Sequence, residues 1–428
     1  MPPRILVLGS GGREHALAWR LALDPEKPEV LVAPGNEAMA RSFRRLAVAV
    51  EDPSAVVELA RREAVSLVVV GPEAPLAAGV ADALEAAGIA VSGASREAAR
   101  LESSKWFAKQ VMREAGVPTA TAESHESLRE ALAALDRFAP RWVVKADGLA
   151  AGKGVLVTSS RSEAEAFVRE CLEGGRFGGS GRRVVLEQFL DGEEASVIAV
   201  CDGTRHVLLP AARDYKRAFD HDLGPNTGGM GSYAPTEAVT VGIEDEVSER
   251  VIAPVLRALA SRGTPYRGAL YAGLMLTADG VQVVEFNARF GDPETQSILP
   301  LVEGSLGTLL ASAARGELEP QAIRRAPLTA VTLALVDEGY PGALRGTGTL
   351  RGLDELERSG VLVFHAGTSW NGSSWDIRGG RAAYITATAE SLEQARAKLM
   401  RARAALSGEG WRCRGDIAVI PAPAMRPS

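Results

Sequence analysis

The chain has 428 residues, of which 46% are hydrophobic and 24% are charged, and its formal net charge is −6 at pH 7. This length predicts roughly two to four domains, and the interspersed acidic and basic residues argue against a nucleic-acid partner, which needs a basic surface. The apolar runs are too short for a membrane span or a secretory signal, so we expect no membrane partner and a cytoplasmic location.

Residues 4–93 alternate apolar runs with amphipathic segments. The runs "RILVLG", "EVLVAPG", "VSLVVVGPE" and "IAVSG" alternate with "REHALAWRLAL", "DPSAVVELARREA" and "PLAAGVADALEAAG". This pattern, with tight Gly and Pro turns, predicts an α/β fold with a doubly wound parallel sheet. Such sheets bind ligands at the carboxyl ends of their strands. Three of these ends are candidates: "GSGGREH" (9–15), "APGN" (33–36) and "GPE" (71–73).

The turn "GSGGREH" is similar to a dinucleotide-binding fingerprint but lacks one of its glycines. Glu14 stands where the third glycine of G-x-G-x-x-G would be. What remains is a glycine-rich turn from a strand into a helix, where free backbone N–H groups and Arg13 can bind an anion such as phosphate. A plain tight turn is the alternative interpretation.

The middle of the chain predicts a second type of unit. A single long helix is expected over 95–116, and a compact α+β unit over about 120–190 contains the strands "RWVVKAD", "GVLVTSS" and "RVVLEQFL" and the helix 161–175. Residues 203–235 are rich in loop-forming residues. A helix over 244–263 then precedes two apolar runs joined by the hairpin signal "TADG". After residue 326 the pattern predicts a β-rich closing domain with one helix.

The stretch "KADGLAAGKG" (145–154) contains three glycines and two lysines but is not a Walker A loop. Only three residues separate Gly148 from Gly152, and Gly154 follows Lys153 where a hydroxyl residue should stand. Lysine is also scarce here, with seven lysines against 41 arginines, and five of the seven lie between residues 105 and 216. These lysines are candidate site residues, although clustering of this kind also arises by chance.

The run "VQVVEFNAR" predicts a metal site. Side chains alternate faces along a strand, so Glu285, Asn287 and Arg289 are expected on one face, with Val284 and Phe286 packed on the other. A carboxylate and an amide on one face can ligate a hard cation such as nucleotide-bound Mg²⁺ (or Mn²⁺). A polar strand face exposed to water is the alternative. The cysteines Cys171, Cys201 and Cys413 have no metal-like spacing and predict reduced thiols.

These features together resemble the ATP-grasp superfamily and, within it, the glycinamide ribonucleotide synthetase family. The resemblance covers residues 4 to about 418. Its motifs, in chain order, are "GGREHALAW", "VAPGN", "VGPEAPL", "KADGLAAGKGV", "EQFLDGEEAS", "GPNTGGMG", "LYAGLM", "EFNARFGDPETQ" and "VFHAGT".

The resemblance implies a fold and an activity. The implied domains are a substrate domain over 1–103, an ATP-grasp domain over 104–325 with its lid over about 120–190, and a closing domain over 326–423. The implied reaction joins glycine to 5-phosphoribosylamine with ATP as co-substrate, through an acyl phosphate, in a monomeric enzyme. The glycine-rich loop would be a flexible lid over ATP.

The resemblance also assigns roles residue by residue. It implies nucleotide contacts by Lys105, Lys145, Gly152, Lys153, Gly154, Glu187, Phe189, Leu190 and Glu194, and metal ligation by Glu285 and Asn287. The sugar phosphate would meet Gly11, Gly12, Arg13, Asn36 and Glu73, and Asn226, Gly291 and Glu294 would also contact substrate. Asp214, Lys216, Arg289 and Asp292 would form the catalytic region.

Two departures from the family pattern stand out. The family usually has Gln-Asp-His-Lys-Arg where this chain has residues 213–217, with Tyr215 in place of the histidine. The strand "LYAGLML" also lacks the carboxylate of other ATP-grasp enzymes, which leaves a second metal in need of another ligand. Two other functions stay open: a different ATP-grasp ligase of purine synthesis, and a protein that binds a nucleotide without turnover.

Overall fold

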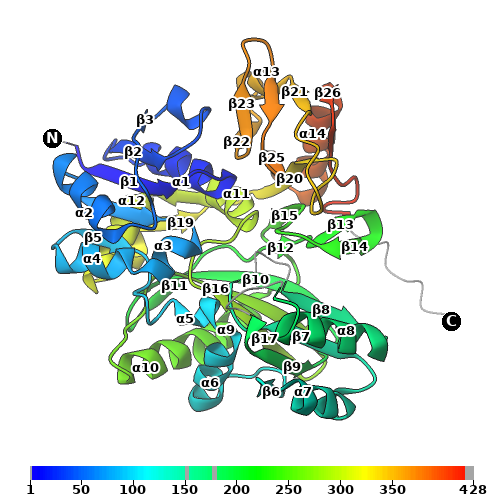
Figure 1. Cartoon of the computed structure of the whole chain (residues 1–428). Helices are drawn as coiled ribbons and strands as arrows, with labels where there is room; N and C mark the ends of the chain where they lie inside the picture. The colour runs from blue at the N-terminus through cyan, green and yellow to red at the C-terminus, as the bar shows by residue number, and fades with distance from the viewer. Residues whose placement is uncertain (1, 150–153, 176–180, 420–428) are drawn as a thin grey trace.

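The computed structural model describes residues 2–149, 154–175 and 181–419. The predicted lid residues Gly152 and Lys153 lie outside these ranges. The described chain forms three groups of elements, with the N-terminal sheet at the left of Figure 1, the C-terminal elements at the top and the central elements below. No helix in the described ranges is long and apolar enough to cross a membrane.

The N-terminal elements form the predicted parallel sheet, with the strand order β3-β2-β1-β4-β5. The predicted helix over 75–88 is wrong in one respect, because it breaks at Gly79, whose φ of 90° ends α3 and begins α4. The strands are β1 (Arg4–Gly9), β2 (Glu29–Pro34), β3 (Arg44–Arg45), β4 (Leu67–Val70) and β5 (Ala90–Ser92), and the helices are α1 (Gly12–Ala22), α2 (Pro53–Arg62), α3 (Glu73–Ala78) and α4 (Val80–Ala86).

The central elements form two four-stranded sheets, β6-β9-β7-β8 and β11-β10-β16-β17. The first sheet and its helices have a hydrophobic core of their own, whereas the second shares a core with the N-terminal sheet. The strands are β6 (Ala122–His125), β7 (Trp142–Ala146), β8 (Val155–Thr158), β9 (Val184–Gln188), β10 (Glu193–Asp202), β11 (His206–Leu208), β16 (Arg267–Thr277) and β17 (Gly280–Asn287). The helices are α5 (Arg100–Ser103), α6 (Lys105–Ala115), α7 (Leu128–Ala134), α8 (Arg161–Leu172), α9 (Val241–Val247) and α10 (Ala253–Ser261).

Two further helices, both in the central elements, differ from the sequence prediction. The helix expected over 95–116 is wrong because Ser104 adopts an extended conformation and its Oγ accepts a hydrogen bond from the N–H of Phe107, which starts α6 anew. The helix expected over 244–263 contains a π-helical turn (Ser248–Ile252) between α9 and α10, just before Pro254. Proline has no N–H to continue the regular ladder.

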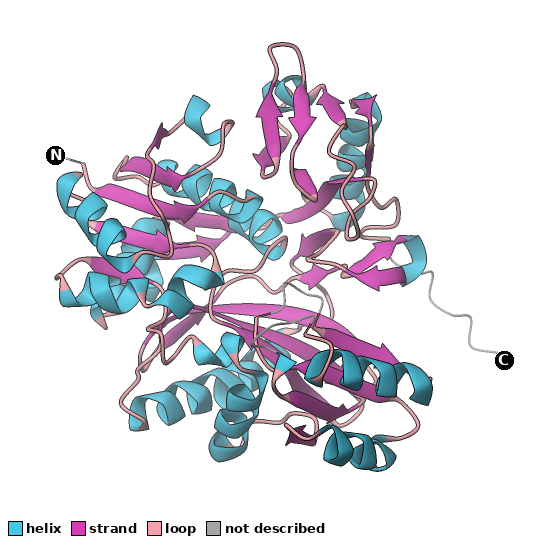
Figure 2. Cartoon of the chain, in the orientation of Figure 1, coloured by secondary structure: helices cyan, strands magenta, loops and turns pink. Residues whose placement is uncertain are grey.

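The prediction of a loop-rich segment over 203–235 is also incomplete. It holds β11, β12 (Arg213–Asp214), β13 (Arg217–Phe219), β14 (Leu223–Asn226) and β15 (Gly231–Ala234). β12 and β15 join a sheet with C-terminal strands, in the order β12-β15-β20-β25-β22. Figure 2 shows these short strands between the central and the upper sheets. Strands this short leave little periodicity in the sequence, because their partners are distant in the chain.

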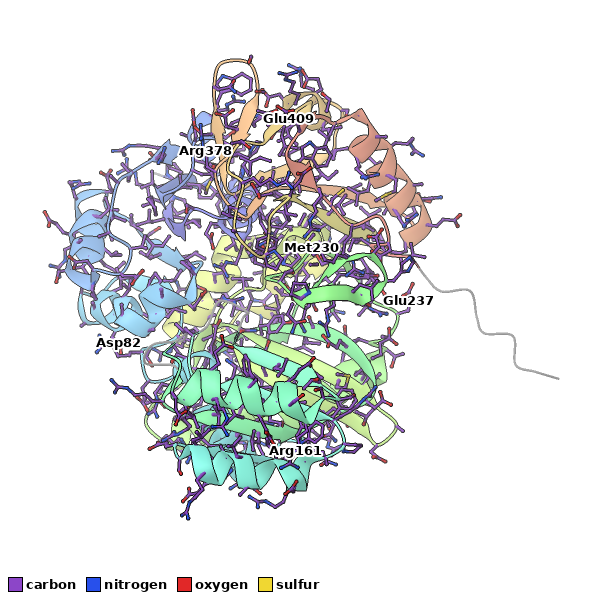
Figure 3. The ribbon with its side chains drawn as sticks, turned by 45° about the vertical axis from the view of Figure 1, so that its right-hand side comes forward. Asp82, Arg161, Met230, Glu237, Arg378 and Glu409 are labelled. Carbon is purple, nitrogen blue, oxygen red and sulfur yellow. The ribbon has the colours of Figure 1, made fainter. Side chains whose placement is uncertain are left out.

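The remaining elements connect the central sheets with the C-terminal domain. They are α11 (Glu294–Ile298), β18 (Val302–Gly304), α12 (Leu306–Arg315), β19 (Ile323–Arg325), β20 (Thr329–Asp337), β21 (Thr349–Arg351), α13 (Leu353–Arg358), β22 (Leu362–His365), β23 (Thr368–Trp370), β24 (Trp375–Ile377), β25 (Arg381–Ala389), α14 (Leu392–Ala405), β26 (Ser407–Glu409) and β27 (Trp411–Arg412). Short 3-10 turns are η1 (Met39–Arg41), η2 (Leu135–Phe138), η4 (Asp220–Asp222), η6 (Leu299–Leu301) and η7 (Pro320–Ala322). Met230, labelled near the middle of Figure 3, is fully buried where these groups meet.

A buried histidine pair joins the N-terminal and C-terminal elements. The N–H of His365 at the end of β22 donates to Nδ1 of His15 on α1 over 3.0 Å. Burial lowers the pKa of His15 to about 4, and burial likewise takes the pKa of His365 well below its ordinary value. Both imidazoles are therefore neutral in the folded protein near pH 7.

We predict that this contact weakens in mild acid. Between pH 6.5 and about 4 the unfolded chain binds a proton at His15 that the folded chain does not, so the free energy of unfolding falls as pH falls. His15→Asn retains a hydrogen-bond acceptor without a titrating group. The wild type should lose more stability than this variant over that range, by at most about 3 kcal/mol, measured by urea unfolding at a series of pH values. Parallel pH profiles would mean that folded His15 takes up its proton normally.

Candidate active site

Strand β17, which the sequence predicts to hold a metal ion, contains a β-bulge that changes the direction of its side chains. Gly273 of β16 pairs with Glu285 and Leu274 with Val283, so Val284 is an extra residue in a β-bulge. Phe286 packs into the core as predicted. The expectation that Val284 packs with it is wrong, because the bulge takes Val284 out of the alternation.

Glu285 faces a cluster of positive charges. Burial favours the neutral carboxyl, but Lys216, Lys105 and Lys145 outweigh this and lower the pKa of Glu285. The carboxylate is therefore ionised next to lysines from three other segments. Asn287, two residues on, offers an amide oxygen from the same face of the strand. A carboxylate and an amide oxygen fit a hard divalent cation that takes its other ligands from a phosphate group.

Three further predicted nucleotide residues, Lys145, Glu187 and Lys105, lie near this strand. Lys145 lies on β7 and Glu187 on β9, and the Lys145 Nζ lies 3.0 Å from Glu187 Oε1. Lys145 also donates to the carbonyl of Val284 over 3.1 Å, so the bulge gives this lysine its second partner. Lys105, at the start of α6, donates to the carbonyl of Gly148 over 3.3 Å. The structure thus brings Lys105, Lys145 and Glu285 into one electrostatic environment.

Lys109 joins this group, although the family resemblance gave it no role. Its Nζ lies 3.0 Å from Glu187 Oε2 and its side chain is 4% exposed. Burial lowers the pKa of Lys109 to about 8, although Glu187 opposes the shift. The scarcity of lysine in the sequence singled it out as a candidate, but no motif gave it a role.

The other predicted nucleotide residues follow these strands. Phe189 and Leu190 come directly after β9 and are half-buried, and the guanidinium of Arg141 lies 4.4 Å from the centre of the Phe189 ring. The carbonyl of Gly154 accepts a hydrogen bond from Ala146 and so closes the described end of the glycine-rich loop. The resemblance implies a nucleotide contact for Glu187, so the ion pairs of its side chain with Lys109 and Lys145 are an additional finding.

A second cluster surrounds Lys216. The Lys216 Nζ lies 2.6 Å from Glu194 Oε2 and 3.8 Å from Asp214 Oδ2. Lys216 lowers the pKa of Glu194, whereas burial raises the pKa of Asp214. Burial opposes the charge on Lys216 itself, but Asp214 and Glu194 raise its pKa well above the ordinary value. Lys216 is therefore a charged lysine held between two carboxyl groups.

Ser196 connects this cluster to Glu294. Its Oγ lies 2.8 Å from the Tyr271 hydroxyl, 3.3 Å from Asp214 Oδ1 and 3.4 Å from Glu294 Oε1. Burial, with a smaller contribution from Asp214, raises the pKa of Glu294 to about 7. Glu294 can therefore exchange a proton near neutral pH. Gly291 makes room for it, since a Cβ there would lie 2.5 Å from Glu294 Oε2.

Arg289 connects the end of β17 to the N-terminal domain. It lies 3.0 Å from Glu102 Oε1 and 3.4 Å from Glu73 Oε2. Glu102 also accepts the N–H of Ala288 over 2.8 Å, which holds the strand end against α5. Burial opposes ionisation of Glu73, but Arg289 and Arg13 lower its pKa. Glu102 was not predicted. The structure buries this acid, but no motif in the sequence singles it out.

The N-terminal turn is occupied by Glu14. Its carboxylate accepts the N–H of Gly11 over 2.7 Å and the Nε of Arg13 over 2.6 Å. A Cβ on Gly71 would lie 2.2 Å from Glu14 Oε1, so this side chain fills the space between the ends of β1 and β4. Arg13 also donates to the carbonyl of Phe290 over 3.2 Å. A Cβ on Gly12 would lie 2.3 Å from the Tyr384 ring, so Gly12 permits packing against the C-terminal domain.

Asp292 is paired with an arginine from the C-terminal domain. Arg381 on β25 contacts Asp292 Oδ2 over 3.0 Å and its carbonyl over 2.9 Å. Burial opposes the charge on Asp292, but Arg381 and Arg13 lower its pKa. Gln296 donates to Asp292 Oδ1 over 2.8 Å. Arg381 was not predicted, since no local pattern relates it to Asp292.

Two predicted substrate residues stand apart from these clusters. The Asn36 side chain donates to the carbonyls of Ser10 and His365 and accepts the N–H of Met39, each over 2.9 Å. These bonds make it a link between the N-terminal and C-terminal domains. Asn226 ends β14 in a two-stranded hairpin with β13. Neither residue has a hydrogen bond to the other predicted site residues within the described ranges.

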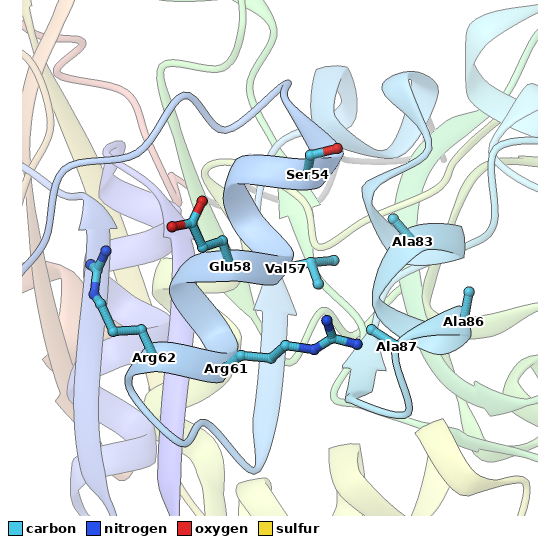
Figure 4. Close-up of a pocket in the computed structure, with 8 residues that line it drawn as sticks. All are labelled: Ser54, Val57, Glu58, Arg61, Arg62, Ala83, Ala86 and Ala87. Atoms are coloured by element: carbon cyan, nitrogen blue, oxygen red, sulfur yellow. The ribbon is translucent and has the colours of Figure 1, made fainter.

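A surface hollow lies apart from these clusters. A cavity of about 720 Å³ lies between α2 and α4 and is lined by Ser54, Val57, Glu58, Arg61, Arg62, Ala83, Ala86 and Ala87 (Figure 4). None of the predicted site residues lines it. The chemistry of the molecule is concentrated instead where β17, β7, β9, β12 and the N-terminal turn converge.

Comparisons with known proteins cover nearly the whole chain. Three family models match it: the phosphoribosylglycinamide synthetase N domain over residues 3–102, the ATP-grasp (A) domain over 103–295 and the C domain over 330–419. The phosphoribosylamine–glycine ligase of Caulobacter vibrioides is 45% identical over 417 residues, covering 96% of this chain and 97% of that protein. The ligase of Streptomyces coelicolor is 46% identical over 427 residues, covering 98% and 100%.

Solved structures agree in fold. The crystal structure of phosphoribosylamine–glycine ligase from Thermotoga maritima matches with a TM-score of 0.83 and 33% identity, covering 97% of this chain and 100% of that one. A biotin carboxylase from Campylobacter jejuni matches with a TM-score of 0.71 at 15% identity, covering 96% of this chain and 92% of that one, a likeness of fold alone.

Proposed function

The chain belongs to the phosphoribosylglycinamide synthetase family of ATP-grasp enzymes, and on this premise we propose that it joins glycine to 5-phosphoribosylamine, with ATP converted to ADP and phosphate. The observation that carries this proposal is the meeting of an ionised Glu285 with Lys105, Lys145 and Lys216. Three lysines around one carboxylate suit the binding of a metal-bound polyphosphate better than a purely structural role.

The chemistry requires activation of a carboxylate. Glycine's carboxylate oxygen attacks the γ-phosphorus of ATP and displaces ADP, which gives an acyl phosphate. The amine of phosphoribosylamine then attacks the acyl carbon, and inorganic phosphate leaves as the C–N bond forms and the amine loses a proton. Catalysis of such a transfer depends on position and charge neutralisation.

The side chains of the site divide this work. Lys105 and Lys145 would bind the phosphates of ATP, and Lys216, held charged by Asp214 and Glu194, would face the transferring group. Glu294, with a pKa near 7, is suited to accept the proton of the attacking amine. Glu285 and Asn287 would hold Mg²⁺, and the bound ion would neutralise phosphate oxygens.

We assign the sugar phosphate to the other side of the site. Arg13 and Glu73 would contact it at the junction of the N-terminal turn with the end of β17. Arg289 and Asp292 of the proposed catalytic region lie within reach of their charge. The domains proposed are 1–103 for the sugar phosphate, 104–325 for ATP and glycine, and 326–423 closing the site through Arg381. The enzyme proposed is a monomer that works in the cytoplasm.

The activity is tested by phosphate release. We expect phosphate release from ATP that requires both glycine and freshly prepared phosphoribosylamine.

Glu285→Gln removes a metal-binding charge, so turnover should fall by at least about a hundredfold and the residual rate should need more Mg²⁺. Glu303→Gln, whose side chain on β18 is 44% exposed, is the matched control. Wild-type turnover by Glu285→Gln at limiting Mg²⁺ would remove this residue from the metal site, and phosphate release with formate in place of glycine would favour a different ligase.

The sugar-phosphate assignment has a separate test at Arg13. Arg13→Ala removes a charge-assisted contact, so binding of glycinamide ribonucleotide should weaken by roughly ten- to a hundredfold, while ATP binding is nearly unchanged. Arg13→Lys should retain part of the affinity. Both ligands would be measured by calorimetry on both variants. An equal loss for ATP would show that Arg13, with its bonds to Glu14 and Phe290, supports the fold rather than the substrate.

A further inference from the structure

Lys109 and Lys145 share one carboxylate in a buried triad with Glu187. Lys109 contacts Glu187 Oε2 and Lys145 contacts Glu187 Oε1, each over 3.0 Å, and all three side chains are 4% exposed. The triad carries a net charge of +1 when all three groups are ionised. A buried carboxylate with a single lysine would instead be a neutral pair, so the second lysine changes the charge that the site presents.

The two lysines differ in how many of their N–H donors are occupied. The Lys109 Nζ lies within 3.2 Å of three oxygens, those of Glu187, Thr119 and Ala120, and an ammonium group has three donors. Lys109 therefore has no donor to offer a ligand. The Lys145 Nζ has two oxygen neighbours among the described residues, Glu187 and the Val284 carbonyl. Within the described ranges, one N–H of Lys145 is therefore left without an acceptor.

Lys109 is also fixed against the metal strand. Thr119, which accepts its hydrogen bond over 2.8 Å, donates in turn to the carbonyl of Val283 over 2.6 Å. The N–H of Val283 bonds to the carbonyl of Pro118 over 2.8 Å. Lys109 is thus connected through Thr119 to Val283 of β17, and the next residue of this strand, Val284, binds Lys145. The two lysines occupy fixed positions on opposite oxygens of Glu187.

We propose that Lys109 is a positioning residue for nucleotide binding. Its positive charge neutralises Glu187, so the charge of Lys145 and the remaining N–H of Lys145 are available to the phosphates of ATP. This inference rests on the proposed function, in which Lys145 binds the nucleotide. Without Lys109, the charge of Lys145 is cancelled by Glu187, and the triad presents no net charge to a polyanion.

The test is a rescue by a second substitution. Lys109→Met should weaken ATP binding by about tenfold, the lower range for a lost charge-assisted contact. In Lys109→Met/Glu187→Gln the carboxylate charge is gone as well, so Lys145 again carries an unopposed charge, and affinity should return to within about threefold of wild type. Binding of ATP with Mg²⁺, without glycine or phosphoribosylamine, would be measured by calorimetry.

Lys105→Met is the matched control, because Lys105 contacts Gly148 and not Glu187. Its loss of affinity should not be recovered by Glu187→Gln. Lys145→Met tests the premise: if it binds ATP as the wild type does, the nucleotide site and this inference both fail. If Lys145→Met loses affinity while Lys109→Met does not, or if the double variant remains as weak as Lys109→Met, only the role of Lys109 is overturned. The double variant decides the question even if Lys109→Met alone does not fold.

Discussion

The buried carboxylate of Glu187 is the contact on which the arrangement of the site depends. It lies on β9 and joins Lys145 of β7 to Lys109 of α6, while Lys145 also holds the bulged Val284 of β17. Removing a charged group from water is costly unless it is paired, so these four elements cannot separate without exposing or orphaning a charge. The sheet containing β7 and β9 has a core of its own, separate from the core beneath β17. The triad therefore fixes two independently packed units relative to one another, at the place where a nucleotide would lie between them.

The sequence predicted those parts of the molecule whose signals are local. The parallel sheet of residues 4–93 followed from alternating apolar runs, and the hairpin of β16 and β17 followed from the turn signal "TADG". Lys145, Glu187 and Glu285 could be named in advance because each lies in a motif. The sequence does not reveal the break at Ser104, because a long amphipathic pattern continues across it. The decisive contact is the hydrogen bond that the Ser104 hydroxyl donates to Asp147 over 3.0 Å, and Asp147 directly follows the distant strand β7.

What the sequence could not predict depends on contacts between segments far apart. The pairing of Arg381 with Asp292 joins residues 89 positions apart, and that of Arg289 with Glu102 spans 187. The bulge at Val284 is a mismatch of register with β16, which single-strand periodicity cannot reveal. The resemblance implies a substrate contact for Asn36, and the structure adds three hydrogen bonds through which its side chain ties together Ser10, Met39 and His365. A motif can therefore mark a polar residue that also has a structural role.

The distribution of charge separates two kinds of chemistry within one site. Around Glu285 three lysines lower the pKa of the carboxyl group, and their charges favour binding and neutralisation of phosphate oxygens. Around Ser196, by contrast, Asp214 and Glu294 are buried, and burial is the main cause that raises the pKa of each carboxyl group. Lys216 lies between the two environments and contributes to both, since Asp214 and Glu194 raise its pKa while its own charge lowers that of Glu285. A phosphoryl group transferred beside Lys216 would thus lie next to Glu294, a carboxyl group able to exchange a proton near neutral pH. Activation of a carboxylate needs the positive charge, and the attack by an amine that follows needs the proton acceptor.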